Sequence, residues 1–201
     1  SSTTASVAAT ESTLGTASTA VVSAPVSATA PTVSAAAFGV FDISAGRWMA
    51  SSHRDEPLRV GSLMKLLTTY VVQQVGDPAH MVKIPAMTID PRESRIGVLP
   101  GEHYDRALLL RAMLIVSASD AARALAIDVG GTEAHFVSMM NAAAASLGLT
   151  GTAARNSMGL DATGAHSTIA DLVRLTLVLR HDPVFLATVR RPSASLHGHV
   201  F

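Results

Sequence analysis

The residues 62–76 predict a helix that carries apolar side chains on nearly every side, and this feature constrains the fold most. Leu66, Leu67 and Val71 fall on different faces of such a helix. A helix that is apolar all round is stable only when other elements surround it, so we expect it at the centre of the core. Lys65 lies within its first turns. Because lysine is rarely buried without a purpose, this position indicates a functional site.

Ser62 precedes Lys65 by three residues, a spacing that places both side chains on one face of a helix. Burial lowers the pKa of a lysine, and a neutral amine can then take the proton of a nearby serine hydroxyl. Unpaired backbone N–H groups at the helix start would stabilise an oxyanion near Ser62. Since S-x-x-K occurs by chance about once in a chain of this size, the spacing alone is weak evidence.

The composition excludes several other classes of function. Fifteen basic residues balance fifteen acidic ones, which gives no electrostatic case for binding nucleic acid. The chain has no cysteine, which excludes disulfides, thiolate nucleophiles and cysteine-ligated zinc. No apolar run is long enough to span a membrane. His197 and His199 lack further ligands at a suitable spacing, so we expect no metal site.

The chain divides into a tail and a folded part. Residues 1–34 are almost entirely Ser, Thr, Ala and Val with two prolines, which is typical of a flexible tether. Residues 35–201 alternate apolar patterns with turn and capping residues. They predict a hairpin (36–43 and 47–50), a short strand (82–85), a loop (91–101), and helices over 105–116, 120–129, 132–147 and 167–179, the last capped by Ser167, with no strong pattern in 181–201.

Several motifs follow one another in an order that resembles one family. They are the hairpin, G-S-L-M-K at 61–65, S-R-I-G at 94–97, L-P-G-E at 99–102, residues 117–126, V-G-G at 129–131, L-G-L at 147–149, and N-S-M-G-L-D at 156–161. Together they resemble the serine D-alanyl-D-alanine carboxypeptidases, the low-molecular-mass penicillin-binding proteins, over residues 30–179. The resemblance implies an α+β, β-lactamase/transpeptidase-like fold. Residues 35–201 would form the N-terminal portion of that domain, mainly its helical subdomain and an N-terminal hairpin, with the central sheet incomplete.

The resemblance also assigns roles to single residues. Ser62 matches the acylated nucleophile, Lys65 the base that activates it, and Ser117 the serine that relays a proton across the cleft. The family usually has a substrate-binding asparagine where this chain has Ser119, so we expect weaker or water-bridged substrate binding there. The third motif, lysine or histidine followed by Thr/Ser-Gly, has no match in residues 180–201. This predicts either a truncated chain or a shortened paralogue.

The function implied is a cofactor-free D-Ala-D-Ala carboxypeptidase that acts on peptidoglycan stem peptides and is acylated by β-lactam antibiotics. Such a protein would be exported and extracytoplasmic, and would meet a membrane only through an anchor outside these residues. The alternative is a non-catalytic relative with a wall-binding or regulatory role, which Ser119 and the unmatched third motif favour. A β-lactamase ranks lowest, because no E-x-x-L-N segment supplies a carboxylate to position the deacylating water.

Overall fold

The computed structural model describes residues 32–196 and 199–201, all of which belong to one compact unit. The tether predicted for residues 1–34 therefore lies almost entirely outside the described residues. In chain order the elements are β1 (Phe38–Asp42), β2 (Arg47–Ser52), the 3₁₀ turn η1 (Gly61–Met64), α1 (Lys65–Gln74), β3 (Met81–Lys83), β4 (His103–Asp105), α2 (Arg106–Ile115), α3 (Ser119–Gly130), α4 (Glu133–Ser146), α5 (Ile169–Leu179), α6 (Pro183–Val189), β5 (Ser195–Leu196) and β6 (His199–Val200).

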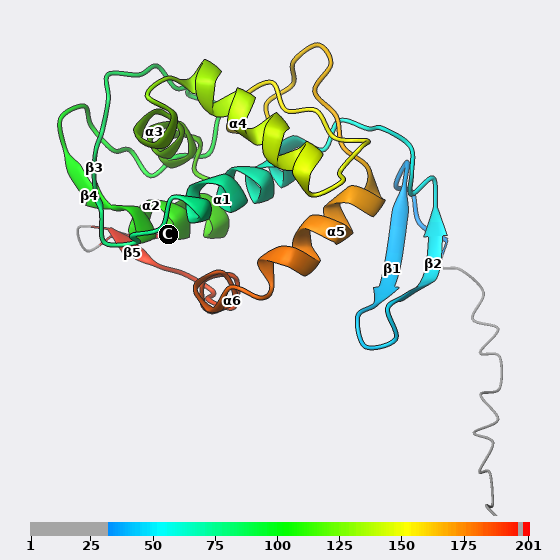
Figure 1. The fold of residues 1–201 in the computed structure, drawn as a ribbon. Coiled ribbons are helices and arrows are strands. Elements are labelled where there is room, and N and C mark those ends of the chain that lie inside the picture. Colours follow the sequence, from blue (N-terminus) through cyan, green and yellow to red (C-terminus); the bar gives the residue numbers. More distant parts are fainter. Residues whose placement is uncertain (1–31, 197–198) are drawn as a thin grey trace, which may run out of the picture. The chain divides into compact units, whose positions relative to one another are not determined.

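The N-terminal hairpin is formed as predicted. β1 pairs antiparallel with β2, with a bulge between Val40 and Phe41. Asp42 shapes the turn, because its Oδ1 accepts hydrogen bonds from the backbone N–H groups of Ser44 and Ala45, at 2.9 Å each. The rings of Phe41 and Trp48 meet edge to face with centroids 5.2 Å apart. The hairpin packs beside α5 (Figure 1).

α1 is the central helix, as its apolar pattern predicted. It contacts α2, α3, α4 and α5, and Leu67, Val71 and Val72 are buried (Figure 1). The prediction of one continuous helix from residue 62 is wrong, because residues 61–64 form the tighter turn η1 before α1 begins. Gly61 enters this turn with φ +54°, a backbone conformation that glycine adopts without steric penalty. The turn places Ser62 at the mouth of the helix.

Side-chain caps start most of the helices. The predicted caps of α2 and α4 are confirmed: Asp105 Oδ1 accepts from Leu108 N at 2.7 Å, and Thr132 Oγ1 accepts from His135 N at 3.1 Å. The prediction that Ser167 caps α5 is wrong. Thr168 is the cap, while the Ser167 backbone pairs with residue 58. A β-bridge thus takes the residue that the local pattern had assigned to the helix.

Four elements were not predicted from the sequence: β4, α6, β5 and β6. The strand predicted at 82–85 is Met81–Lys83, and it pairs with β4, whose last residue, Asp105, is the cap of α2. α5 is not the last helix, because α6 follows it, opened by Asp182 and by Pro183 at its first position. All four elements are short. Short elements carry too few residues for a periodic pattern to stand out.

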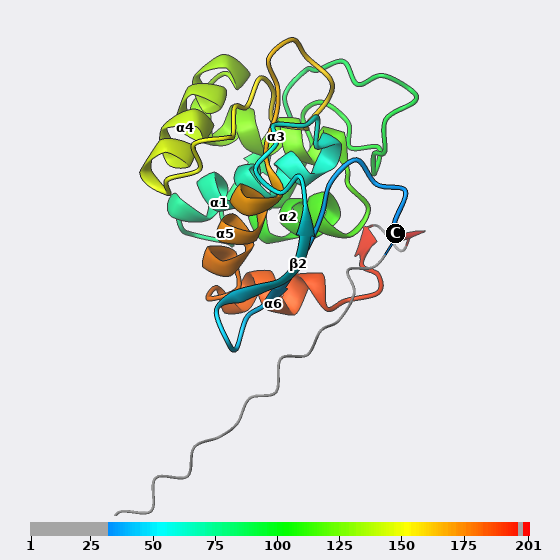
Figure 2. The same cartoon turned by 90° about the vertical axis from the view of Figure 1, so that its right-hand side faces the viewer.

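The described residues contain three sheets of two strands each, so helices form most of the core. This agrees with the expected fold class, in which the helical part dominates and the central sheet is incomplete. Between β3 and β4 the chain runs through a long segment without regular structure, drawn in green in Figure 2. This segment reaches the start of α3, where Ser94 O accepts a hydrogen bond from Ser119 N at 2.8 Å.

Candidate active site

Three side chains predicted to act together meet in space. Ser62 comes from η1, Lys65 is the first residue of α1, and Ser117 lies in the link between α2 and α3. Lys65 Nζ lies 3.1 Å from Ser62 Oγ and 3.2 Å from Ser117 Oγ, and the Ser117 hydroxyl donates to Ser62 Oγ at 2.9 Å. All three line an open cleft of about 300 Å³. The arrangement provides a continuous path for a proton among two hydroxyls and one amine.

Ser117 reaches the other two residues because its backbone is in the left-handed region. Its φ is +60°, which residues with a side chain rarely adopt. Such a conformation costs about 1–3 kcal/mol and persists only where the surrounding structure holds it. The buried Ala118 follows at once and fixes the chain before α3 begins. This left-handed backbone conformation directs the Ser117 hydroxyl towards the cleft.

Burial changes the acid–base behaviour of Lys65. The residue is 3% exposed, and desolvation lowers the pKa of its amine from 10.5 to about 8, while the Glu93 carboxylate acts in the opposite direction. At pH 7.4 roughly a fifth of the amine would then be neutral, against about 0.1% for an exposed lysine. Ser62, in contrast, is exposed to the cleft. A neutral amine beside an accessible hydroxyl is the arrangement that proton removal from a serine requires.

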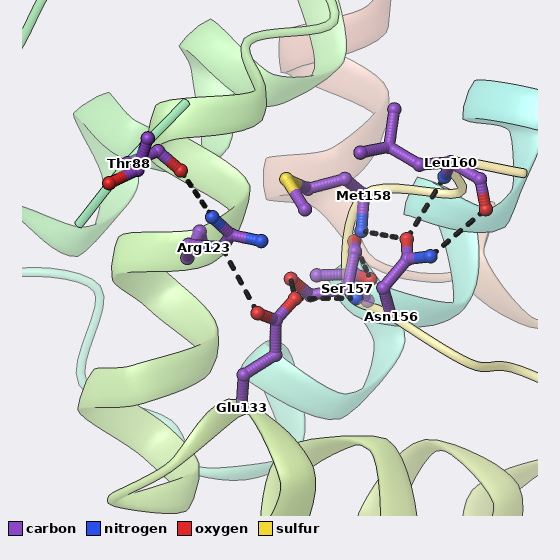
Figure 3. A network of polar contacts seen from close by, with 8 residues as sticks. Thr88, Arg123, Glu133, Asn156, Ser157, Met158 and Leu160 are labelled. Atoms are coloured by element: carbon purple, nitrogen blue, oxygen red, sulfur yellow. Dashed lines mark hydrogen bonds and ion pairs between the residues drawn. The ribbon is translucent and has the colours of Figure 1, made fainter. Parts of the chain in front are cut away.

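A backbone carbonyl completes the surroundings of the amine. Lys65 Nζ donates to Met158 O at 2.8 Å, the shortest of its contacts. Asn156 shapes this segment: its Oδ1 accepts from Met158 N and Leu160 N, at 3.1 and 2.9 Å, and its Nδ2 donates to Leu160 O at 2.9 Å (Figure 3). Asn156 therefore fixes the shape of the loop that carries the Met158 carbonyl.

Gly159 brings this loop against the nucleophile turn. Its φ is +79°, and a Cβ at this position would lie 2.1 Å from the carbonyl oxygen of Gly61. Any side chain would therefore push residue 61 away and displace Ser62. Asp161, two residues further along the same loop, forms an exposed ion pair with Arg59 at 3.2 Å.

Ser119, predicted to bind substrate, is the first residue of α3 and only 2% exposed. The next residue, Asp120, holds the neighbouring loop, because its carboxylate accepts hydrogen bonds from three successive backbone N–H groups, those of residues 96–98, at 2.8–3.3 Å. The start of α3 is therefore bonded to the loop of residues 94–98 twice, through the Ser119 N–H and through the Asp120 carboxylate. The role of Ser119 in substrate binding stays a prediction.

Three contributors to the site were missed from the sequence: the Met158 carbonyl, the Glu93 carboxylate and Asp120. A backbone carbonyl carries no signal of its residue type. Glu93 and Asp120 had a weak signal, since each is an acidic residue next to a serine of a recognised motif. Within the described ranges, no cluster of His, Cys, Asp and Glu is suited to a metal ion. His197, named in the metal prediction, lies outside those ranges.

Comparison with known proteins identifies the family. The sequence profile of the D-alanyl-D-alanine carboxypeptidases, Peptidase_S11, matches residues 24–197. The chain belongs to this family. The carboxypeptidase DacC of Escherichia coli is 36% identical over 168 residues, which cover 76% of this chain and 41% of DacC. DacB2 of Mycobacterium tuberculosis is 34% identical over 157 residues, which cover 77% of this chain and 54% of DacB2. The chain thus spans about half the length of these curated relatives.

Solved structures show the same fold. Penicillin binding protein 6B from Escherichia coli superimposes with a TM-score of 0.81 at 28% identity, over 88% of this chain and 60% of that protein. A D-alanyl-D-alanine carboxypeptidase from Mycobacterium tuberculosis gives a TM-score of 0.80 at 30% identity, over 88% of this chain and 69% of that one. The fold is transpeptidase-like, as the sequence motifs predicted.

Proposed function

We propose that this chain carries the nucleophile side of a serine D-Ala-D-Ala carboxypeptidase site. The observation that supports the proposal is the triangle of Ser62, Lys65 and Ser117, with contacts of 2.9–3.2 Å around a desolvated amine. Family membership supports it independently, since the matching relatives are named D-alanyl-D-alanine carboxypeptidases. The reaction uses only side chains, backbone groups and water, and so requires no cofactor.

The geometry supports the following acylation step. Neutral Lys65 accepts the proton of the Ser62 hydroxyl as Ser62 Oγ attacks the carbonyl carbon of the terminal D-Ala–D-Ala bond. Backbone N–H groups at the start of η1, beside Ser62, stabilise the negative charge that develops on the carbonyl oxygen. The proton on Lys65 then passes through the Ser117 hydroxyl to the leaving nitrogen, and free D-alanine departs. Water hydrolyses the resulting Ser62 ester and regenerates the hydroxyl.

The proposed substrate is a peptidoglycan stem peptide, and β-lactam antibiotics are the proposed acylating inhibitors. The curated relatives named D-alanyl-D-alanine carboxypeptidases support the substrate, and the solved penicillin-binding proteins, one of them with cefotaxime bound, support the inhibitors. A protein with this substrate would work outside the cytoplasm, which is the localisation we propose. Across the part of the chain that the structure describes, no helix has the length and apolar character needed to cross a membrane.

Two finer proposals concern the organisation of the chain and of the site. We propose that residues 1–34 are a flexible tether and that residues 35–201 are the N-terminal portion of the peptidase domain. At the cleft we propose that Ser119 binds substrate through a bridging water. The serine side chain is shorter than the asparagine side chain usual in the family, and Ser119 is almost completely buried, so a water would have to link its hydroxyl to the substrate.

Intact-mass spectrometry with a penicillin tests the proposed function. A β-lactam resembles the D-Ala-D-Ala terminus, so it reports acylation without the natural muropeptide. We expect one adduct of the mass of the penicillin on the unmodified chain and none on Ser62→Ala. Turnover is tested by measuring the D-alanine that the chain releases from a peptide ending in D-Ala-D-Ala. A folded chain that gains no adduct would contradict the proposal and favour the non-catalytic alternative.

A further inference from the structure

The orientation of the Lys65 amine depends on the Met158 carbonyl. A neutral amine has two N–H bonds and one lone pair, and only the lone pair can accept the Ser62 proton. Met158 O takes one N–H at 2.8 Å, and Ser117 Oγ lies 3.2 Å from the same nitrogen. With both N–H bonds directed to these oxygens, the lone pair faces Ser62. A shift of the Met158 carbonyl would therefore turn the lone pair away from the hydroxyl it must deprotonate.

The position of that carbonyl is set by the residue before it. Ser157 is fully buried, and its own carbonyl oxygen accepts from Thr68 Oγ1 at 2.7 Å. Thr68 lies one turn after Lys65 on the same face of α1, so two successive peptide groups of this loop are attached to one face of the helix. The Ser157 N–H and hydroxyl point away from α1, towards the start of α4. Their partner there holds residue 157 from the side opposite to α1, and so helps to fix where the chain continues to Met158.

That partner is the carboxylate of Glu133, the first residue of α4. Its Oε1 accepts from Ser157 Oγ at 2.8 Å and from Ser157 N at 3.2 Å, while its Oε2 pairs with Arg123 Nε at 3.0 Å. Arg123 also donates to Thr88 O. Figure 3 shows the resulting chain of contacts from Arg123 through Glu133 and Ser157 to Asn156 and Met158. The Glu133 and Arg123 side chains are three-quarters buried, which strengthens such charge-assisted bonds.

We propose that Glu133 is a positioning residue for the acylation of Ser62: through Ser157 it holds the Met158 carbonyl, and thereby directs the lone pair of Lys65 towards the Ser62 hydroxyl. Glu133 acts through its neighbours and does not touch the reacting atoms. The inference rests on the proposed function, because it assigns Glu133 to the step in which Lys65 serves as the base. It adds α4 to the elements that control the site.

Two variants at one position separate the hydrogen bond from the charge. Glu133→Gln and Glu133→Ala remove the same charge, but glutamine keeps an oxygen that can accept from Ser157. Alanine leaves the buried Ser157 N–H and hydroxyl without that acceptor. We expect the rate constant of acylation by a fluorescent penicillin to fall about tenfold or more in Glu133→Ala, and clearly less in Glu133→Gln. Ser157→Ala, which keeps the ion pair with Arg123, should also slow acylation.

Asp128→Asn is the matched control. It weakens another largely buried ion pair, Asp128 Oδ2 with Arg106 Nη2 at 2.9 Å, which joins α3 to the start of α2. This variant should lose thermal stability to a similar degree but acylate at the unmodified rate at temperatures where it is folded. The comparison distinguishes positioning from general destabilisation, because a merely structural role of Glu133 would give the same pattern as Asp128→Asn.

An NMR titration of the Lys65 ¹³Cε signal supplies a readout that needs no acylation. We expect the titration midpoint of Lys65 in Glu133→Ala to differ from that in Glu133→Gln by about half a pH unit or more. If the unmodified chain is never acylated, the proposed function fails, and this titration still shows whether Glu133 controls the surroundings of the Lys65 amine. Unchanged midpoints, or unchanged acylation rates in the folded alanine variants, would overturn it. If Glu133→Ala does not fold, Ser157→Ala decides by the same two measurements.

Discussion

The rate of Ser62 acylation should rise with pH in a single step centred near pH 8. Only neutral Lys65 can accept the Ser62 proton, and burial lowers the pKa of this amine from 10.5 to about 8. The neutral fraction then grows from roughly 1% at pH 6 to half at pH 8 and about 90% at pH 9. We therefore expect an acceleration of about 50-fold between pH 6 and pH 8, and less than about twofold between pH 9 and pH 10.

Stopped-flow fluorescence with a labelled penicillin, recorded from pH 6 to pH 10, measures this profile. Ser62→Ala provides the blank, and circular dichroism at each pH verifies that the chain stays folded. A lysine with its ordinary pKa would instead give a rate that still rises about tenfold from pH 8 to pH 9. That slope would refute the argument that burial prepares Lys65 as the base. A rate that is flat from pH 6 to pH 9 would refute the role of Lys65 altogether.

The same burial has a consequence for stability. Because the pKa of Lys65 is lower in the folded than in the unfolded chain, the unfolded chain binds more protons between about pH 8 and pH 10.5. The free energy of unfolding contributed by this residue therefore increases with pH across that window. Below pH 8 its burial costs the folded state on the order of 3 kcal/mol. Urea unfolding of Lys65→Met beside the unmodified chain isolates this contribution, since other titrating groups are common to both.

Three further predictions follow from contacts around the site. Glu93→Gln removes the charge that raises the pKa of Lys65, so the acylation profile should move to lower pH; a shift to higher pH would contradict this. Gly159→Ala should lower the free energy of unfolding by at least about 2 kcal/mol, by thermal or urea unfolding. Gly46→Ala, at φ +63° with open space around it, should cost less, and equal losses would argue against the clash with Gly61. Asp120→Asn should destabilise the chain by about 1–3 kcal/mol and increase amide exchange in residues 96–98, whereas unchanged exchange would show that the loop is held by other contacts.

The sequence determined the features that depend on residues close together in the chain. Asp105 and Thr132 bond to N–H groups three residues ahead, so each helix start could be predicted from a short segment. The Ser62–Lys65 pair follows from one helical turn in the same way. The apolar residues on every side of α1 required that helix to be central, and this in turn predicted a buried Lys65 with a lowered pKa.

Only the tertiary structure decided what surrounds that lysine. The Met158 carbonyl lies 93 residues away in the chain, and a backbone oxygen is the same in every residue type. Ser117 points into the cleft because the start of α3 holds its backbone in a strained conformation, which no local pattern favours. Thr168, not Ser167, caps α5, because the distant residue Leu58 pairs with Ser167 in an isolated β-bridge. Capping and helical spacing are short-range and therefore readable in sequence, whereas the orientation of the Lys65 lone pair depends on contacts that exist only after the chain has packed.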